Sequence, residues 1–123
     1  MVNMSKIYKQ YSINITCLKI GNDFNITIYG GDTPHIGAIA VSYPNKIINH
    51  NSISPTISLI TLPGHKEDSL ALESAKILCK TLNSTVVVSC GIHYDNFEFK
   101  DIKNINEIVN YLIKETIKNY TQK

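Results

Sequence analysis

The sequence contains no arginine and no tryptophan, and all twelve of its basic residues are lysines. Without arginine, an anionic ligand has to be held by lysine or by backbone N–H groups, because no bidentate guanidinium is present. The formal net charge is only +2. That excess is too weak to predict nucleic acid as a partner, since nucleic-acid-binding domains usually carry a clustered basic face.

Long apolar runs are missing as well. No stretch approaches the ~18 residues of a membrane-spanning helix, and the first six residues lack the apolar segment of a secretory signal. We therefore expect a cytoplasmic protein without membrane contact. The three cysteines, Cys17, Cys79 and Cys90, are scattered among apolar neighbours and form no C-x-x-C pair, which predicts reduced thiols in the core.

The chain is long enough to fold around a core of its own. It has 123 residues, of which 43% are hydrophobic, and a domain of this size buries roughly two thirds of its unfolded surface. We expect one domain over residues 1–123, with frayed ends at about 1–6 and 119–123.

Alternating apolar and polar residues predict strands in the first half of the chain. The expected strands cover about 7–20, 24–29, 35–43 and 56–62. A turn at 21–23 makes a hairpin of the first two, and the polar, asparagine-rich stretch 44–55 is expected to be a loop.

Helical periodicity dominates the second half of the chain. One amphipathic helix is predicted from about residue 66 to Leu82 and another within 100–118, with a short buried strand at 85–90 between them. The order β-β-β-β-α-β-α predicts an α+β fold in which a mostly antiparallel five-stranded sheet carries both helices on one face. The other sheet face, which carries Tyr29 or Phe24, is expected to be covered in a homodimer, the most frequent oligomer.

Three short segments are candidates for a binding site. Paired glycines in Gly30–Gly37 favour a turn whose N–H groups receive an anion. In Leu62–Glu67 a strand passes through glycine into a helix start beside Lys66, an arrangement that binds phosphate readily. The third, Cys90–Asp95, follows a buried strand, where ligand sites are common. A plain strand connection, a capped helix start and an ordinary turn remain open as alternatives.

Each candidate segment contributes one histidine: His35, His65 and His93. Three histidines are able to form a metal site with an open position, or to act as acids and bases. Their long spacing does not show that they converge, so the metal remains unknown. Asp32 and Asp95 lie in the same segments, where turn roles explain them equally well. No G-x-S-x-G, activated cysteine or paired acid motif is found, so we do not expect an enzyme.

The three segments together resemble a known family. G-G-D-T-P-H-I-G-A at 30–38, L-P-G-H-K-E-D at 62–68 and G-I-H at 91–93 resemble, in this order and spacing, the prenylated-flavin chaperone family typified by LpdD. The resemblance extends from about Ile13 to Ile117. The element order is also similar to that of the small proteasome-assembly chaperones, which work as dimers.

The first resemblance implies an accessory protein that binds prenylated FMN and helps to install it in a UbiD-type decarboxylase. It implies no catalytic residue. The alternative is a protein-assembly chaperone that acts through protein–protein contacts. The phosphate is expected between the 30–37 turn and the helix start at 64–66. The implied ligand contacts are Gly30, Gly31, Pro34, His35, Gly37, Gly64, His65, Lys66, Gly91 and His93.

Overall fold

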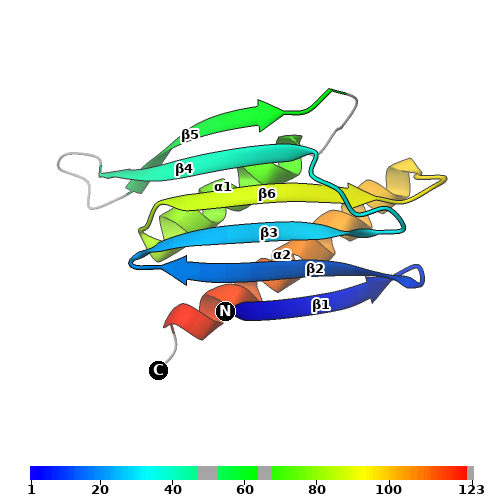
Figure 1. Ribbon diagram of the computed structural model, residues 1–123, viewed down its shortest axis with the longest axis horizontal. Helices are drawn as coiled ribbons and strands as arrows, with labels where there is room; N and C mark the ends of the chain where they lie inside the picture. Colours follow the sequence, from blue (N-terminus) through cyan, green and yellow to red (C-terminus); the bar gives the residue numbers. More distant parts are fainter. Residues whose placement is uncertain (47–52, 64–67, 122–123) are drawn as a thin grey trace.

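The computed structural model describes residues 1–46, 53–63 and 68–121. They form one mixed sheet in the order β1-β2-β3-β6-β4-β5, with both helices on one face (Figure 1). Every neighbouring pair is antiparallel except β3 and β6, which are parallel. This confirms the mostly antiparallel α+β fold. The elements are β1 (Val2–Tyr8), β2 (Tyr11–Ile20), β3 (Asp23–Gly31), β4 (Ala38–Lys46), β5 (Ile53–Thr61), α1 (Asp68–Leu82), β6 (Val86–His93) and α2 (Phe99–Thr121).

The sheet has six strands, so the expected count of five and the order β-β-β-β-α-β-α are wrong by one strand. The single strand predicted over 7–20 is interrupted by a tight turn at Lys9 and Gln10, whose φ angles are 49° and 64°. This turn contains no glycine, asparagine, aspartate or proline, which are the residues that usually mark one. The N-terminal residues expected to fray instead pair with β2 from Val2 to Tyr8.

Two other predicted boundaries differ from the structure. The loop expected at 44–55 is shorter, because Pro44 and Pro55 lie opposite each other in the β4–β5 pair; residues 47–52 lie outside the described part. The second helix continues to Thr121 rather than ending near 118. Its last turn is held by Tyr120, whose ring centre lies 4.9 Å from that of Phe24. Residues 122–123 lie outside the described part.

The core lies between the sheet and the helices. Alternate residues of the central strands point toward the helices and are buried, and the apolar stripes of α1 and α2 pack on them. All three cysteines are buried and none forms a disulfide, as predicted. The largest apolar side chains with almost no exposure are Ile13, Ile15, Ile26, Ile28, Leu78, Val86, Val88, Val109, Leu112 and Ile113.

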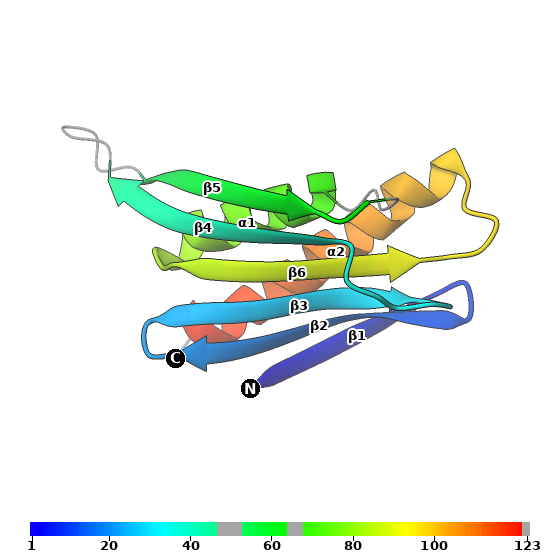
Figure 2. The ribbon, with the colours of Figure 1, turned by 45° about the horizontal axis from the view of Figure 1, so that its top comes forward.

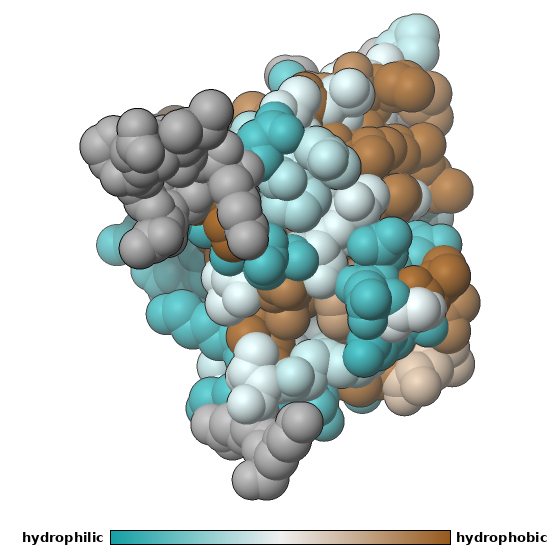
Figure 3. All heavy atoms as spheres, turned by 90° about the vertical axis from the view of Figure 1, so that its left-hand side faces the viewer, coloured by the Kyte–Doolittle hydropathy of each residue, from teal (hydrophilic) through white to brown (hydrophobic). Residues whose placement is uncertain are grey.

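The other face of the sheet is not covered by any described element (Figure 2). Tyr29 lies on this uncovered face, whereas Phe24 lies in the core against α2. Exposed apolar side chains gather on the β4–β5 half of the face: Val41, Tyr43 and Ile60 are 40%, 56% and 63% exposed. Figure 3 shows such side chains along its upper right edge, which is the uncovered face seen from the side. None of the described helices is long and apolar enough to span a membrane.

A buried carboxylate connects the first hairpin to α2. The side chain of Asp101, in the first turn of α2, has no exposed surface. It accepts hydrogen bonds from the Tyr8 hydroxyl and the Glu98 amide and pairs with the Lys9 ammonium at 2.8 Å. The Lys9 contact, followed by those of Tyr8 and Glu98, holds the pKa of Asp101 well below its usual range. The turn that the sequence pattern missed is therefore stabilised by a tertiary contact.

Replacing Asp101 with asparagine tests this anchor. Because the folded-state pKa is depressed, the charge of Asp101 contributes stability above its unfolded pKa, and this stability is lost as the pH falls toward the folded value. We expect Asp101→Asn to lower the melting temperature by about 10 °C at pH 7, measured by circular dichroism. The deficit should shrink as the pH falls below about 4. Glu107→Gln, on the exposed surface of the same helix, is the control; equal melting temperatures for all three proteins at pH 7 would contradict the anchor.

Candidate functional site

The connection from β3 to β4 has to cross β6, because β6 lies between these two strands in the sheet. Residues 32–37, which we call the crossing segment, pass over the carboxyl end of β6 on the uncovered face (Figure 2). Two backbone hydrogen bonds hold the segment at its ends: the Asp32 amide donates to the His93 carbonyl, and the Gly37 amide donates to the Cys90 carbonyl, both at 2.9 Å. The crossing brings two of the predicted site segments together.

Glycines make this close crossing possible. A Cβ atom on Gly91 would lie 1.6 Å from the carbonyl oxygen of His35, and one on Gly31, whose φ is +87°, would lie 1.8 Å from that of His93. A Cβ atom on Gly30 would also meet the backbone of β2, at 2.4 Å from the Ser12 carbonyl oxygen. The space left by the three missing side chains is therefore occupied by the chain's own backbone.

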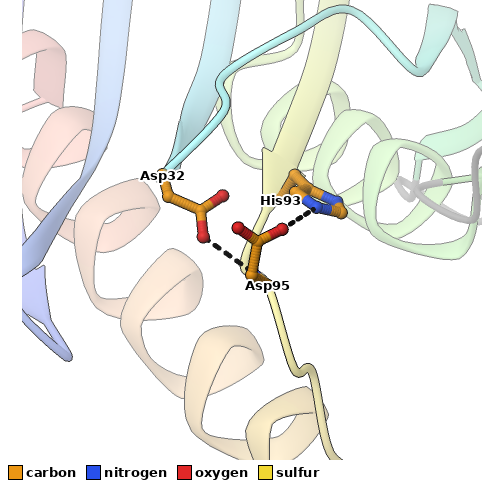
Figure 4. A group of neighbouring side chains, drawn as sticks. All are labelled: Asp32, His93 and Asp95. Carbon is orange, nitrogen blue, oxygen red and sulfur yellow. Dashed lines mark hydrogen bonds and ion pairs between the residues drawn. The ribbon is translucent and has the colours of Figure 1, made fainter.

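Three side chains meet where β3 and β6 end (Figure 4). Asp32 follows β3, His93 is the last residue of β6, and Asp95 lies two residues farther on. Nε2 of His93 is 3.1 Å from Oδ1 of Asp95, and the Asp95 amide donates to Oδ2 of Asp32 at 2.7 Å. One donor atom from each residue lies within 4.8 Å of the other two. We call these residues the Asp–His–Asp cluster.

The cluster is acidic and partly open to solvent. The hydrogen bond from the Asp95 amide holds the pKa of Asp32 below its ordinary value, against the effect of partial burial, so this carboxylate is ionised at neutral pH. The side chains of His93 and Asp95 are 50% and 76% exposed. The cluster therefore favours cations and hydrogen-bond donors and repels a phosphate placed directly on it.

His35 is the second histidine at this end of the sheet. Its Nδ1 donates to the Thr33 carbonyl at 3.2 Å, and its ring centre lies 6.3 Å from that of His93. Two of the three predicted histidines are thus neighbours. Gly64, His65 and Lys66 lie outside the described residues. The chain leaves β5 toward them from the same place, since the Leu62 amide donates to the Gly37 carbonyl at 2.9 Å.

Tyr94, between His93 and Asp95 in the chain, connects the cluster to the β1–β2 hairpin. Its side chain is buried, its hydroxyl donates to the Tyr8 carbonyl at 2.9 Å, and its ring packs edge-on against the rings of Tyr8 and Tyr11. Burial, with the nearby Tyr8, Asp32 and Asp101, raises its pKa to about 12. The neutral phenol of Tyr94 therefore holds the backbone between His93 and Asp95 in place. The sequence patterns did not indicate this role.

The roles of Asp32 and Asp95 were also left open by the sequence. As separate residues in two turns they are unremarkable, because aspartate is common in turns. The sequence feature that could have indicated their meeting is that each lies within two residues of the end of a strand. These strands, β3 and β6, are parallel neighbours in the sheet. Two exposed apolar side chains, Ile36 and Leu62, flank Gly37 at the far end of the crossing segment, so the segment runs from an acidic group to apolar surface.

The fold and the cluster define a small α+β domain whose candidate site lies at the crossing over β6. Residues 7–121 match the family model of the prenylated flavin chaperone LpdD-like domain, and the chain therefore belongs to that family. No curated protein sequence matches the chain.

A chain in the crystal structure of a novel chaperone complex for yeast 20S proteasome assembly shares the fold. Its TM-score is 0.52 at 14% sequence identity, and the match covers 94% of this chain and 97% of that one. At this identity the similarity concerns the fold alone. It agrees with the fold-level resemblance to the small proteasome-assembly chaperones.

The crossing is tested by adding one methyl group to Gly91. Because its Cβ would meet the His35 backbone, the crossing segment has to move, and we expect Gly91→Ala to reduce the free energy of unfolding by about 1–3 kcal/mol. Urea titration followed by circular dichroism measures this. Gly21→Asn is the control, since no atom lies within 4 Å of a Cβ there and asparagine tolerates positive φ; it should change stability by less than about 0.5 kcal/mol. Equal effects of both changes would rule out the close packing at Gly91.

Proposed function

We propose that this domain carries prenylated FMN and helps to deliver it to a UbiD-type decarboxylase, without catalysing a reaction itself. The observation that carries the proposal is the match to the prenylated-flavin chaperone family over residues 7–121. Its support in the structure is the meeting of the 30–37 and 91–93 segments, which hold two of the three stretches that resemble the family.

The ligand contacts divide into two kinds. We propose that Pro34, His35, Gly37 and His93 touch the ligand directly. Gly30, Gly31 and Gly91 then act by allowing the crossing segment to pack closely on β2 and β6.

The charge of the site orients the ligand. Asp32 and Asp95 repel a dianionic phosphate, whereas Ile36 and Leu62 offer apolar surface. We propose that the ring system and the prenyl group lie against the crossing segment and that the phosphate points toward Gly64, His65 and Lys66. A helix start with a lysine favours phosphate, and lysine is the only basic side chain type in the chain besides histidine.

The ligand is tested by co-expressing the domain with a flavin prenyltransferase and analysing it by native mass spectrometry. We expect a mass increase that corresponds to one prenylated FMN per chain. Lys66→Ala should weaken binding about 10- to 150-fold, because it removes a charge-assisted hydrogen bond worth about 1.5–3 kcal/mol. The control is Asn22→Ala, in the β2–β3 turn at the opposite end of the sheet (Figure 1), which should bind like the parent.

Delivery needs a separate measurement, the activation of a decarboxylase apoenzyme by the loaded domain. If the parent binds neither FMN nor its prenylated form, the flavin proposal fails. The second candidate, a protein-assembly chaperone, then takes its place. The observation that favours it is the uncovered sheet face with Val41, Tyr43 and Ile60 exposed, because apolar patches of this kind often mark protein contacts.

We also propose that the domain is a homodimer joined through the uncovered face. Light scattering should give twice the 13.8 kDa mass of one chain at micromolar concentration. Val41→Glu places a charge in the apolar patch and should shift the mass to that of a single chain with an unchanged circular dichroism spectrum. Ile102→Glu, on the exposed surface of α2, should leave the dimer intact; a single-chain mass for the parent would exclude it.

A further inference from the structure

We propose that Asp32, His93 and Asp95 bind one divalent transition-metal cation. The three residues come from two parts of the chain and meet where the parallel strands β3 and β6 end (Figure 4). They provide one imidazole nitrogen and two carboxylate groups as donors. The site differs from the three-histidine site that the sequence left open: His93 belongs to it, His35 is not one of the three ligands, and His65 lies outside the described residues.

The donor spacing suits a single ion. A cation about 2.1 Å from each of its ligands holds neighbouring ligand atoms about 3.0–3.4 Å apart in tetrahedral or octahedral geometry. Nε2 of His93 and Oδ1 of Asp95 are already 3.1 Å apart. One donor atom from each of the three residues lies within 4.8 Å of the other two, and binding of the ion draws them closer together.

The second oxygen of Asp32 provides an independent observation. Oδ1 is shielded from solvent and has no hydrogen-bond partner within residues 1–46, 53–63 and 68–121. Removing an ionised oxygen from water without a partner is costly. The ion pair between His93 and Asp95 explains their own contact but leaves this oxygen unexplained. A cation among the three side chains supplies the missing partner.

The donor types indicate which cation fits. Imidazole together with carboxylates suits Zn²⁺ or Mn²⁺, whereas Mg²⁺ and Ca²⁺ prefer oxygen ligands alone. The two carboxylates exceed the charge of His93 in either protonation state, so a divalent ion also relieves their repulsion. Because His93 and Asp95 are half or more exposed, the remaining coordination positions face solvent. The cation site does not depend on the proposed flavin function.

The site is tested on untagged protein that has been stripped with a chelator, in the absence of any flavin. We expect isothermal titration calorimetry with Zn²⁺ and with Mn²⁺ to show one saturable site per chain for at least one of the two ions. Asp32→Asn keeps the acceptor for the Asp95 amide but removes the charge, and Asp95→Asn changes a mostly exposed side chain. Each should weaken binding by at least about tenfold.

Two controls separate loss of the site from general effects. Glu73→Gln removes an exposed carboxylate of α1 and should bind the ion like the parent. Circular dichroism tests whether the metal-free variants are folded. If Asp32→Asn unfolds, the affinity of Asp95→Asn for the ion alone tests the site, because Asp95 is the more exposed residue. Absence of saturable binding in the parent, or unchanged affinity in Asp95→Asn, overturns the proposal. Because no flavin is present, neither result bears on flavin binding.

Discussion

The site depends on one topological constraint: the chain has to pass from β3 to β4 across the strand that separates them. β6 is the last strand in the sequence, and it lies in the sheet between β3 and β4, which both precede it. The connection between those strands lies on the uncovered face over the end of β6, where only glycine at position 91 leaves room for the His35 carbonyl. In this crossing segment the Asp32 amide donates to the His93 carbonyl, and the His35 ring centre lies 6.3 Å from that of His93. The parallel pairing of β3 and β6 brings Asp32 to His93, and the crossing adds His35 to them.

The crossing is supported from the opposite side of the sheet. Tyr94, between two residues of the Asp–His–Asp cluster, donates to the Tyr8 carbonyl, and the Tyr8 hydroxyl in turn donates to the buried Asp101 of α2. A continuous set of polar contacts thus runs from the exposed cluster to the start of α2. Buried polar groups that are fully paired hold a site rigidly. The acidic cluster is therefore presented on a stable support.

Local patterns predicted the fold more completely than the site. The alternation along β3 and the stripes of both helices predicted their elements, because burial on one face imposes a period on the sequence. The turn at Lys9 and Gln10 was missed, since neither residue type normally marks a turn and its stability comes partly from Asp101, far away in the chain. Asp32 and Asp95 were recognised as turn residues only, because each is ordinary in its own segment.

The sequence by itself determined the α+β class, the buried thiols, the two amphipathic helices and the three segments that place the chain in the prenylated-flavin chaperone family. These properties follow from periodicity and from residues that are close in the chain. Only the tertiary structure decided that β3 and β6 are parallel neighbours, that the glycines serve the crossing, and that Asp32 joins His93 and Asp95. The physical reason is that strand order depends on which long-range pairs form, and a period-two pattern specifies the face of a strand but not its neighbour.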